Sequence, residues 1–170
     1  MRMPLAIIAL LCSASPQAES LHSALKNRPQ YYEDSAGYKL LSAVLENENK
    51  DSWRLKSLDI SKQSMKPNGL SLCKQLPAEF RTAADDLSSK SPNVMHFRRR
   101  FSLKLPYSLT YGGGATDIVI SVVGFDAAKD HAVVTVFKGC GSMCSSGSTY
   151  LFRKVEAEWQ RVGIVCETMS

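Results

Sequence analysis

The sequence predicts an α+β domain, in which helices pack on an antiparallel meander of about four to six strands and disulfides brace the chain. Two segments place apolar residues at helical spacing, one from Ser35 and one just after Pro77. The last third of the chain holds four β-rich runs with short connections. After an N-terminal leader, four cysteines remain, and an even number is typical of disulfide-bonded exported proteins.

Residues 1–20 have the build of a secretory signal peptide. Arg2 supplies a positive charge, an apolar run extends from Pro4 to Cys12, and small and polar residues follow. The run is too short to cross a bilayer, which takes about 20 apolar residues. Leu11 stands where a lipid-attachment site normally has a small residue, so we expect soluble export to a periplasm or the medium. Cleavage could follow Ala14, Ala18 or Ser20.

Residues 21–170 are enough for a single domain with a core of its own. The leader carries one charge of each sign, Arg2 and Glu19, so the mature chain keeps the net charge of +5. This excess favours anionic partners such as phospholipid, envelope polymer or nucleic acid, although a soluble protein without such a partner can be equally basic. No further apolar run reaches membrane length, and no stable membrane anchor is expected.

The elements of the first half follow from periodicity and turn residues. Residues 21–34 are expected to form an entry arm rather than a packed element, and Ser35 is the expected N-cap of a helix over 35–48. Imperfect alternation predicts a strand from about Trp53 to Lys62, and KPNG at 66–69 predicts a turn. The stripe of the first helix consists of Tyr38, Leu41, Val44 and Leu45.

The second helix is expected just after Pro77, because proline is tolerated at the first helical position. Its buried stripe would be Phe80, Ala83, Ala84 and Leu87. Alternation at Phe101, Leu103 and Leu105 predicts a further strand. The four runs DIVISVVGF, HAVVTVFKG, STYLFRKVE and EWQRVGIVC follow. Their hairpin-sized links predict antiparallel neighbours, since a parallel crossover needs a dozen residues or more.

Four stretches, YKLLSAVLENE, LKSLDIS, ISVVGFDAAKDHAVVTV and CGSMCSSGSTYLFRKVEAEWQRV, together resemble a widespread group of uncharacterised exported bacterial proteins. That group has a Tyr-Ser-x-Val-Leu type helix, a Ser-x-Val-Gly-Phe type strand and a Cys-Gly-x-x-Cys type turn before a final strand pair. The chain departs from it at 121–123, where an arginine is often seen, and at Ser145, which replaces a glycine. The resemblance implies export and a single domain, and it implies no activity.

The four remaining cysteines are read first as disulfides, and three pairings are open in principle. A glycine-rich turn can bring Cys140 and Cys144 within the roughly 4.4 to 6.8 Å that a disulfide needs, which would leave Cys73 with Cys166. The turn would then hold a rigid polar loop that could contact a partner. Its candidate contact residues are Ser142, Met143, Ser145 and Ser146.

The cysteines of this turn lack the partner residues that catalysis or metal binding would need. Cys144 could act as a nucleophile with His131 and Asp130, but adjacent residues on a strand point to opposite faces. Redox dithiols use a two-residue spacer at a helix start, and zinc needs four ligands, whereas His96 and His131 are not spaced as a pair. We therefore expect no catalytic residue here, no metal and no cofactor.

A run of cations is the second candidate surface, and it consists of Arg98, Arg99, Arg100 and Lys104. Guanidinium forks beside phenylalanines could bind phosphate or carboxylate. On a strand, Arg98 and Arg100 would share one face and Arg99 the other, with Phe97 and Phe101. A basic edge strand that discourages aggregation explains the same pattern. Nucleic acid is not expected without a binding motif, and YGGG lacks the Lys and Ser/Thr of a phosphate loop.

Two functions remain. The sequence favours a non-enzymatic binding module that contacts a protein or an anionic envelope polymer. The alternative is a small thiol enzyme or hydrolase whose site comes from residues distant in sequence. An enzyme should show a concave pocket with convergent polar groups, and a binding module need not.

Overall fold

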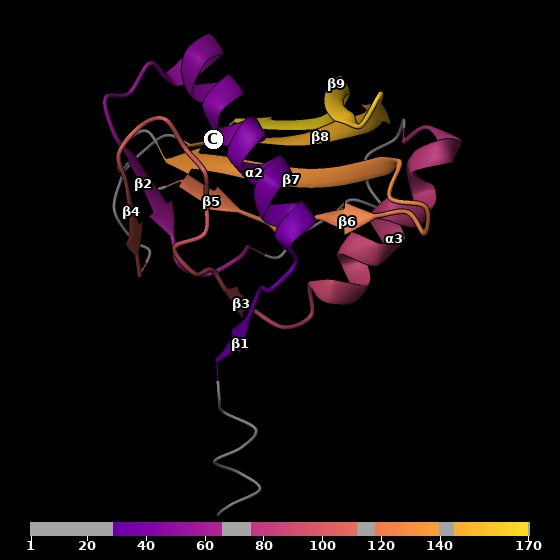
Figure 1. Cartoon of the computed structure of the whole chain (residues 1–170), viewed down its shortest axis with the longest axis horizontal. Coiled ribbons are helices and arrows are strands. Elements are labelled where there is room, and N and C mark those ends of the chain that lie inside the picture. The colour runs from indigo at the N-terminus through magenta and orange to yellow at the C-terminus, as the bar shows by residue number, and fades with distance from the viewer. Residues whose placement is uncertain (1–28, 66–75, 112–117, 140–144, 170) are drawn as a thin grey trace, which may run out of the picture.

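A computed structural model describes residues 29–65, 76–111, 118–139 and 145–169. The described chain is an α+β fold with a mixed seven-stranded sheet, a separate two-stranded sheet and two α-helices (Figure 1). The helices are α2, Ser35–Glu48, and α3, Arg81–Lys90. The predicted α+β class is therefore confirmed, but the large sheet has more strands than the four to six expected. No helix in the described ranges is long and apolar enough to cross a membrane.

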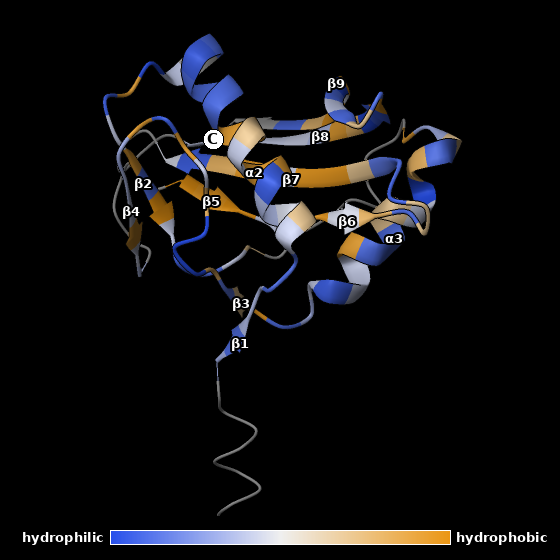
Figure 2. Cartoon of the chain, viewed as in Figure 1, coloured by the Kyte–Doolittle hydropathy of each residue, from blue (hydrophilic) through white to orange (hydrophobic). Residues whose placement is uncertain are grey.

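The large sheet has the order β4-β2-β5-β7-β8-β9, with β6 also paired to β7. Helix α2 crosses the sheet, and α3 packs against β6 and β7 at one end (Figure 1). The strands of this sheet are β2 Leu58–Ser61, β4 Tyr107–Thr110, β5 Ile118–Ile120, β6 Gly124–Phe125, β7 His131–Gly139, β8 Ser145–Val155 and β9 Glu158–Met169. Figure 2 shows strongly hydrophobic residues on β5 and β7, in the middle of the sheet.

The C-terminal half of the sheet is the predicted antiparallel meander. Strands β8 and β9 are joined by the two-residue turn Glu156–Ala157, in which both residues have positive φ, as a type I′ hairpin requires. The run DIVISVVGF is interrupted between β5 and β6. There, the Ser121 N–H donates to the Thr135 carbonyl, and the Thr135 N–H donates to Ser121 Oγ, so a side chain replaces one ladder bond.

The other half of the sheet corrects the prediction of an antiparallel meander. Strand β2 lies parallel to both β4 and β5. A parallel pair needs a long connection, and the segment between β2 and β4, which contains α3, supplies one. Strand β2 is also shorter than expected, because Asn49–Trp53 continue α2 as a π-helix. The Asn49 side chain then bonds both the N–H and the carbonyl of Leu55.

Both predicted helices are confirmed, with one correction at a cap. Asp34, not Ser35, caps α2, since its Oδ1 accepts from the N–H groups of Ala36 and Gly37. Helix α3 follows a 3₁₀ turn at Ala78–Phe80. The predicted stripes are buried: Tyr38, Leu41, Val44 and Leu45 on the first helix, and Phe80, Ala83, Ala84 and Leu87 on the second.

The arm before α2 is more packed than predicted. Its strand β1, Gln30–Tyr31, pairs in parallel with β3, Met95–His96. Tyr32 is 4% exposed and belongs to the core. Its ring contacts the rings of Tyr38 and Phe97, so the arm closes one end of the hydrophobic core.

No strand forms over residues 97–106, contrary to the alternation at 101–105. Three N–H groups of this segment donate to side chains of α2, whereas only Phe97 N–H donates to the backbone beside β2, at the Lys62 carbonyl. Arg98 N–H donates to Tyr38 Oη at 2.7 Å, Ser102 N–H to Ser42 Oγ at 2.9 Å and Lys104 N–H to Glu46 Oε1 at 2.5 Å. The segment is therefore held against the helix as irregular backbone with Phe97 and Phe101 buried beneath it.

Candidate functional site

The three consecutive arginines all face outward. Because their segment is not a strand, Arg99 does not share a face with the buried Phe97 and Phe101, which corrects the predicted division into two faces. The Arg100 N–H donates to the Arg98 carbonyl at 2.7 Å, so the backbone makes a tight turn at the arginines. All three cations are thus available to solvent.

Glu33, in the arm before α2, forms ion pairs with two of them and so compensates one of their two positive charges. Its Oε1 lies 3.0 Å from Arg98 Nε, and its Oε2 lies 2.5 Å from an Arg100 guanidinium nitrogen. All three side chains are about half exposed, so the pairs contribute little to folding stability. Their main effect is to fix where the guanidinium groups lie.

The arginines meet a lysine from another segment. Lys62, just after β2, donates from Nζ to Tyr111 Oη at 2.7 Å. This hydrogen bond raises the pKa of Lys62, so its ammonium group stays charged at neutral pH. Within the described residues, neither Lys62 nor Arg99 forms an ion pair.

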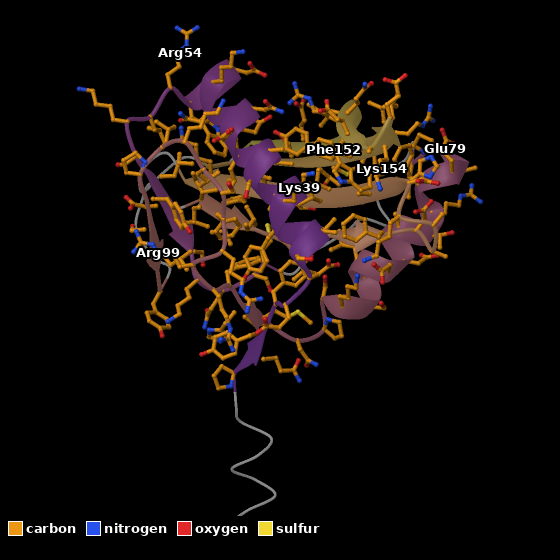
Figure 3. The ribbon with its side chains drawn as sticks, in the orientation of Figure 1. Lys39, Arg54, Glu79, Arg99, Phe152 and Lys154 are labelled. Carbon is orange, nitrogen blue, oxygen red and sulfur yellow. The ribbon has the colours of Figure 1, made fainter. Side chains whose placement is uncertain are left out.

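These groups surround a hollow of about 400 Å³, which we call the basic groove. The Arg98 guanidinium lies over the Tyr31 ring at 4.3 Å, and the Arg99 guanidinium lies over the Tyr107 ring at 5.4 Å. Such stacking holds a guanidinium in place and leaves its N–H edge free for a ligand. Figure 3 shows Arg99 beside β4, an edge strand of the large sheet. The groove is lined by Tyr31, Lys62, Phe97, Arg98, Arg99 and Leu109.

The predicted cationic set does not act as one patch. Arg100 lines a different hollow, of about 490 Å³, along α2 with Ser102 and Lys39. Lys104 lines a third, of about 290 Å³, with Glu46 and Lys50. Arg98 and Arg99 are brought together with Lys62, which the sequence analysis missed. No pattern around Lys62 marks it, because its partners belong to distant segments.

The structure describes only part of the glycine-rich turn and its candidate contact residues. Ser145 and Ser146 begin β8. Ser142 and Met143 lie outside the described residues, as do Cys73, Cys140 and Cys144. Cys166, on β9, is disulfide-bonded, and the pairing of the four cysteines stays a prediction.

His131 has a carboxylate partner, but not the one considered from sequence. Its Nδ1 lies 2.8 Å from Asp126 Oδ2, and Asp126 Oδ1 accepts from the N–H groups of Asp130 and His131. The imidazole packs edge-on against Phe80, at 5.0 Å between ring centroids. This arrangement closes the turn between β6 and β7. Among the residues with described positions, no group of three or more His, Cys, Asp or Glu could hold a metal ion.

No protein-family model, curated protein or solved structure matches this chain. The resemblance to an exported bacterial group therefore stays a prediction.

Proposed function

We propose that the protein is an exported binding module that holds an anionic envelope polymer in the basic groove. The observation that carries this proposal is the convergence of Lys62, Arg98 and Arg99 from two separate segments beside one groove. Arg98 alone of the three is paired, with Glu33. Two uncompensated cations at one concave site favour a ligand with closely spaced negative charges.

The chemistry of the groove fits phosphate or carboxylate groups. A guanidinium presents two parallel N–H donors to an oxyanion, and an ammonium group adds a point charge. Tyr31 and Leu109 supply the apolar surface between the cations. A polymer that repeats its charges could contact all three cations at once, which a single small anion would not do as well.

Export and disulfide bracing belong to the same proposal. The leader-like residues 1–20 would be removed, and Cys73, Cys140, Cys144 and Cys166 would form two bridges. An intact mass of protein from its native compartment, taken before and after reduction and alkylation, tests both. Free alkylation of the unreduced protein would contradict the bracing.

The groove is tested with Lys62→Gln/Arg99→Gln and inorganic polyphosphate as the probe. Removing two cations that contact the anion should weaken binding about tenfold or more at low salt. The matched control is Arg153→Gln/Lys154→Gln, which removes the same charge from exposed side chains on β8. Figure 3 shows Lys154 far from Arg99 across the molecule. Dissociation constants from titration calorimetry provide the comparison.

Equal weakening in both double variants would mean that net charge alone, and not the groove, attracts the polymer. A parallel titration with poly-L-glutamate distinguishes a phosphate from a carboxylate ligand. Unchanged affinity in Lys62→Gln/Arg99→Gln for both polymers would contradict the proposal.

A further inference from the structure

A fourth hollow, of about 390 Å³, lies at the C-terminal end of α2. Its walls come from the end of α2, the π-helix Asn49–Trp53 and strands β7, β8 and β9. We call it the sheet-end pocket. π-helical turns are rare and are found frequently at functional sites. Here, the turn brings Asp51 and Trp53 over the sheet, which an α-helix ending at Glu48 would not do.

One wall of the pocket is a closed polar network. The Arg161 guanidinium lies 2.7 Å from Glu48 Oε1 and 3.8 Å from Asp51 Oδ2. Burial, together with the neighbouring Glu48 carboxylate, raises the pKa of Tyr150 to about 12, so its hydroxyl stays protonated and can donate. Arg161 compensates the Glu48 carboxylate, whose side chain is only 9% exposed, and the second carboxylate, Asp51, leaves this wall with a net charge of −1. The network is a rigid support, and its one cation is already bound to carboxylates.

The other wall carries two charges that the network does not use. Lys138, on β7, places Nζ 5.3 Å from the centre of the Trp53 ring, and Glu167 projects from β9. In the described part of the chain, neither side chain forms an ion pair. Burial lowers the pKa of Lys138, and a bound anion would offset that loss of solvation.

The strand register sets these two charges on one surface with hydroxyl groups between them. Lys138 is paired with Ser146 across β7 and β8, and Ser148 is paired with Glu167 across β8 and β9. Directly paired residues in an antiparallel sheet point to the same face. Apolar surface borders them, because Ile164 is 43% exposed and Trp53 is half-buried.

We propose that the sheet-end pocket binds a small zwitterion of the amino-acid type. Its carboxylate would lie on Lys138, its ammonium group on Glu167, and its apolar side chain against Trp53 and Ile164. One unpaired charge of each sign, serine hydroxyls between them and an apolar border match the three parts of such a molecule. The volume lies within the range of ordinary small-ligand pockets.

The pocket has the concave shape and the convergent polar groups expected of an enzyme site. Its described side chains nevertheless include no histidine or cysteine, and the charged groups opposite the two hydroxyls, Lys138 beside Ser146 and Glu167 beside Ser148, are the ones assigned to the charges of the ligand. Binding rather than catalysis is therefore the role that these residues support.

The test uses the full chain labelled with ¹⁵N, and L-leucine as the probe. The indole N–H signal of Trp53 should shift with saturation, whereas that of Trp159, near Phe125 at the far end of β9, should not. N-acetyl-leucine lacks the ammonium group and leucinamide lacks the carboxylate, so each should bind at least about tenfold more weakly than leucine. No saturable shift of Trp53, or equal affinity for all three molecules, would overturn the proposal.

Two variants test which side chain binds the carboxylate of the ligand and which binds its ammonium group. Lys138→Met should remove the advantage of leucine over leucinamide, and Glu167→Gln should remove its advantage over N-acetyl-leucine. Lys154→Met, at an exposed position near the other end of the same sheet, is the control and should leave all three affinities unchanged. Because Glu167 is exposed, its variant is expected to fold even if Lys138→Met does not. Retention of the full leucine preference in Glu167→Gln would refute the assignment.

Discussion

At the scale of single residues, Asp126 and His131 show how a polar pair fixes a turn. Burial by itself raises the pKa of Asp126, but hydrogen bonds from the His131 ring and from the His131 and Asp130 N–H groups outweigh it and lower the pKa below its usual value. A carboxyl group whose pKa is lower in the folded state stabilises that state above its unfolded pKa of about 3.9. This stabilisation is lost as the pH falls through the folded value.

Asp126→Asn should therefore lower the free energy of unfolding by about 1 to 2 kcal/mol at pH 7, because it removes charge-assisted hydrogen bonds. At a more acidic pH, below the unfolded pKa of about 3.9, the difference should shrink, because the stabilisation by this charge is lost as the pH falls toward the folded pKa. Urea unfolding at the two pH values measures it. Asp130→Asn, four residues further along the chain at an exposed position, should change little at either pH. A difference that is the same at both pH values would show that the Asp126 charge is not what stabilises the turn.

Single residues also mark the limit of what the sequence could predict about the site. Arg98 and Arg99 were predicted because three consecutive arginines are conspicuous. Lys62 and Tyr31 were missed, because each stands alone in its own segment and joins the groove only through tertiary packing. Glu48 was missed for a different reason: at the end of an amphipathic helix, a glutamate looks solvated, and only the structure shows it 7% exposed beside Arg161.

At the scale of elements, α3 lies close against β6 at Gly124. A Cβ atom built at Gly124 would collide with the Ala83 carbonyl oxygen and with Leu87, both on α3. The contact involves backbone, so a side-chain rotation cannot relieve it. Glycine at this position therefore sets how closely the helix and the strand can approach.

Gly124→Ala should lower the free energy of unfolding by about 1 to 3 kcal/mol, since overpacking forces α3 and β6 apart. Gly163→Ala on β9 is the matched control, because nothing lies within 4 Å of a Cβ atom built there. The control should stay within about 0.5 kcal/mol of the wild type in urea denaturation. Equal stability of the two variants would mean that the helix moves away without cost.

The elements that were predicted correctly are those specified by local pattern. Both helices have four apolar residues at helical spacing, and the hairpins of the C-terminal half have links too short for any other connection. The prediction of a strand around Phe101 is wrong, because alternation of apolar residues alone does not form a strand. That segment needs a neighbour for its N–H groups, and it finds Tyr38, Ser42 and Glu46 of α2 instead.

At the scale of the whole molecule, the parallel pairing of β2 with β4 and β5 could not be predicted. Short links fix strand direction, but long connections leave it open, so the choice depends on contacts between residues distant in sequence. This pairing places Lys62, at the end of β2, beside Tyr111, at the end of β4. The topology that the sequence analysis missed is therefore also what assembles the basic groove.

The binding of an anionic polymer in the basic groove is tested most directly by mapping the shifts of backbone amide signals on addition of polyphosphate. We expect saturable shifts concentrated at Tyr31, Lys62, Arg98, Arg99 and Leu109 that weaken as salt is added, because exposed charges are screened. Shifts centred on Arg153 and Lys154, or small shifts spread over every lysine and arginine, would contradict the account. They would show that the chain attracts anions only through its net charge.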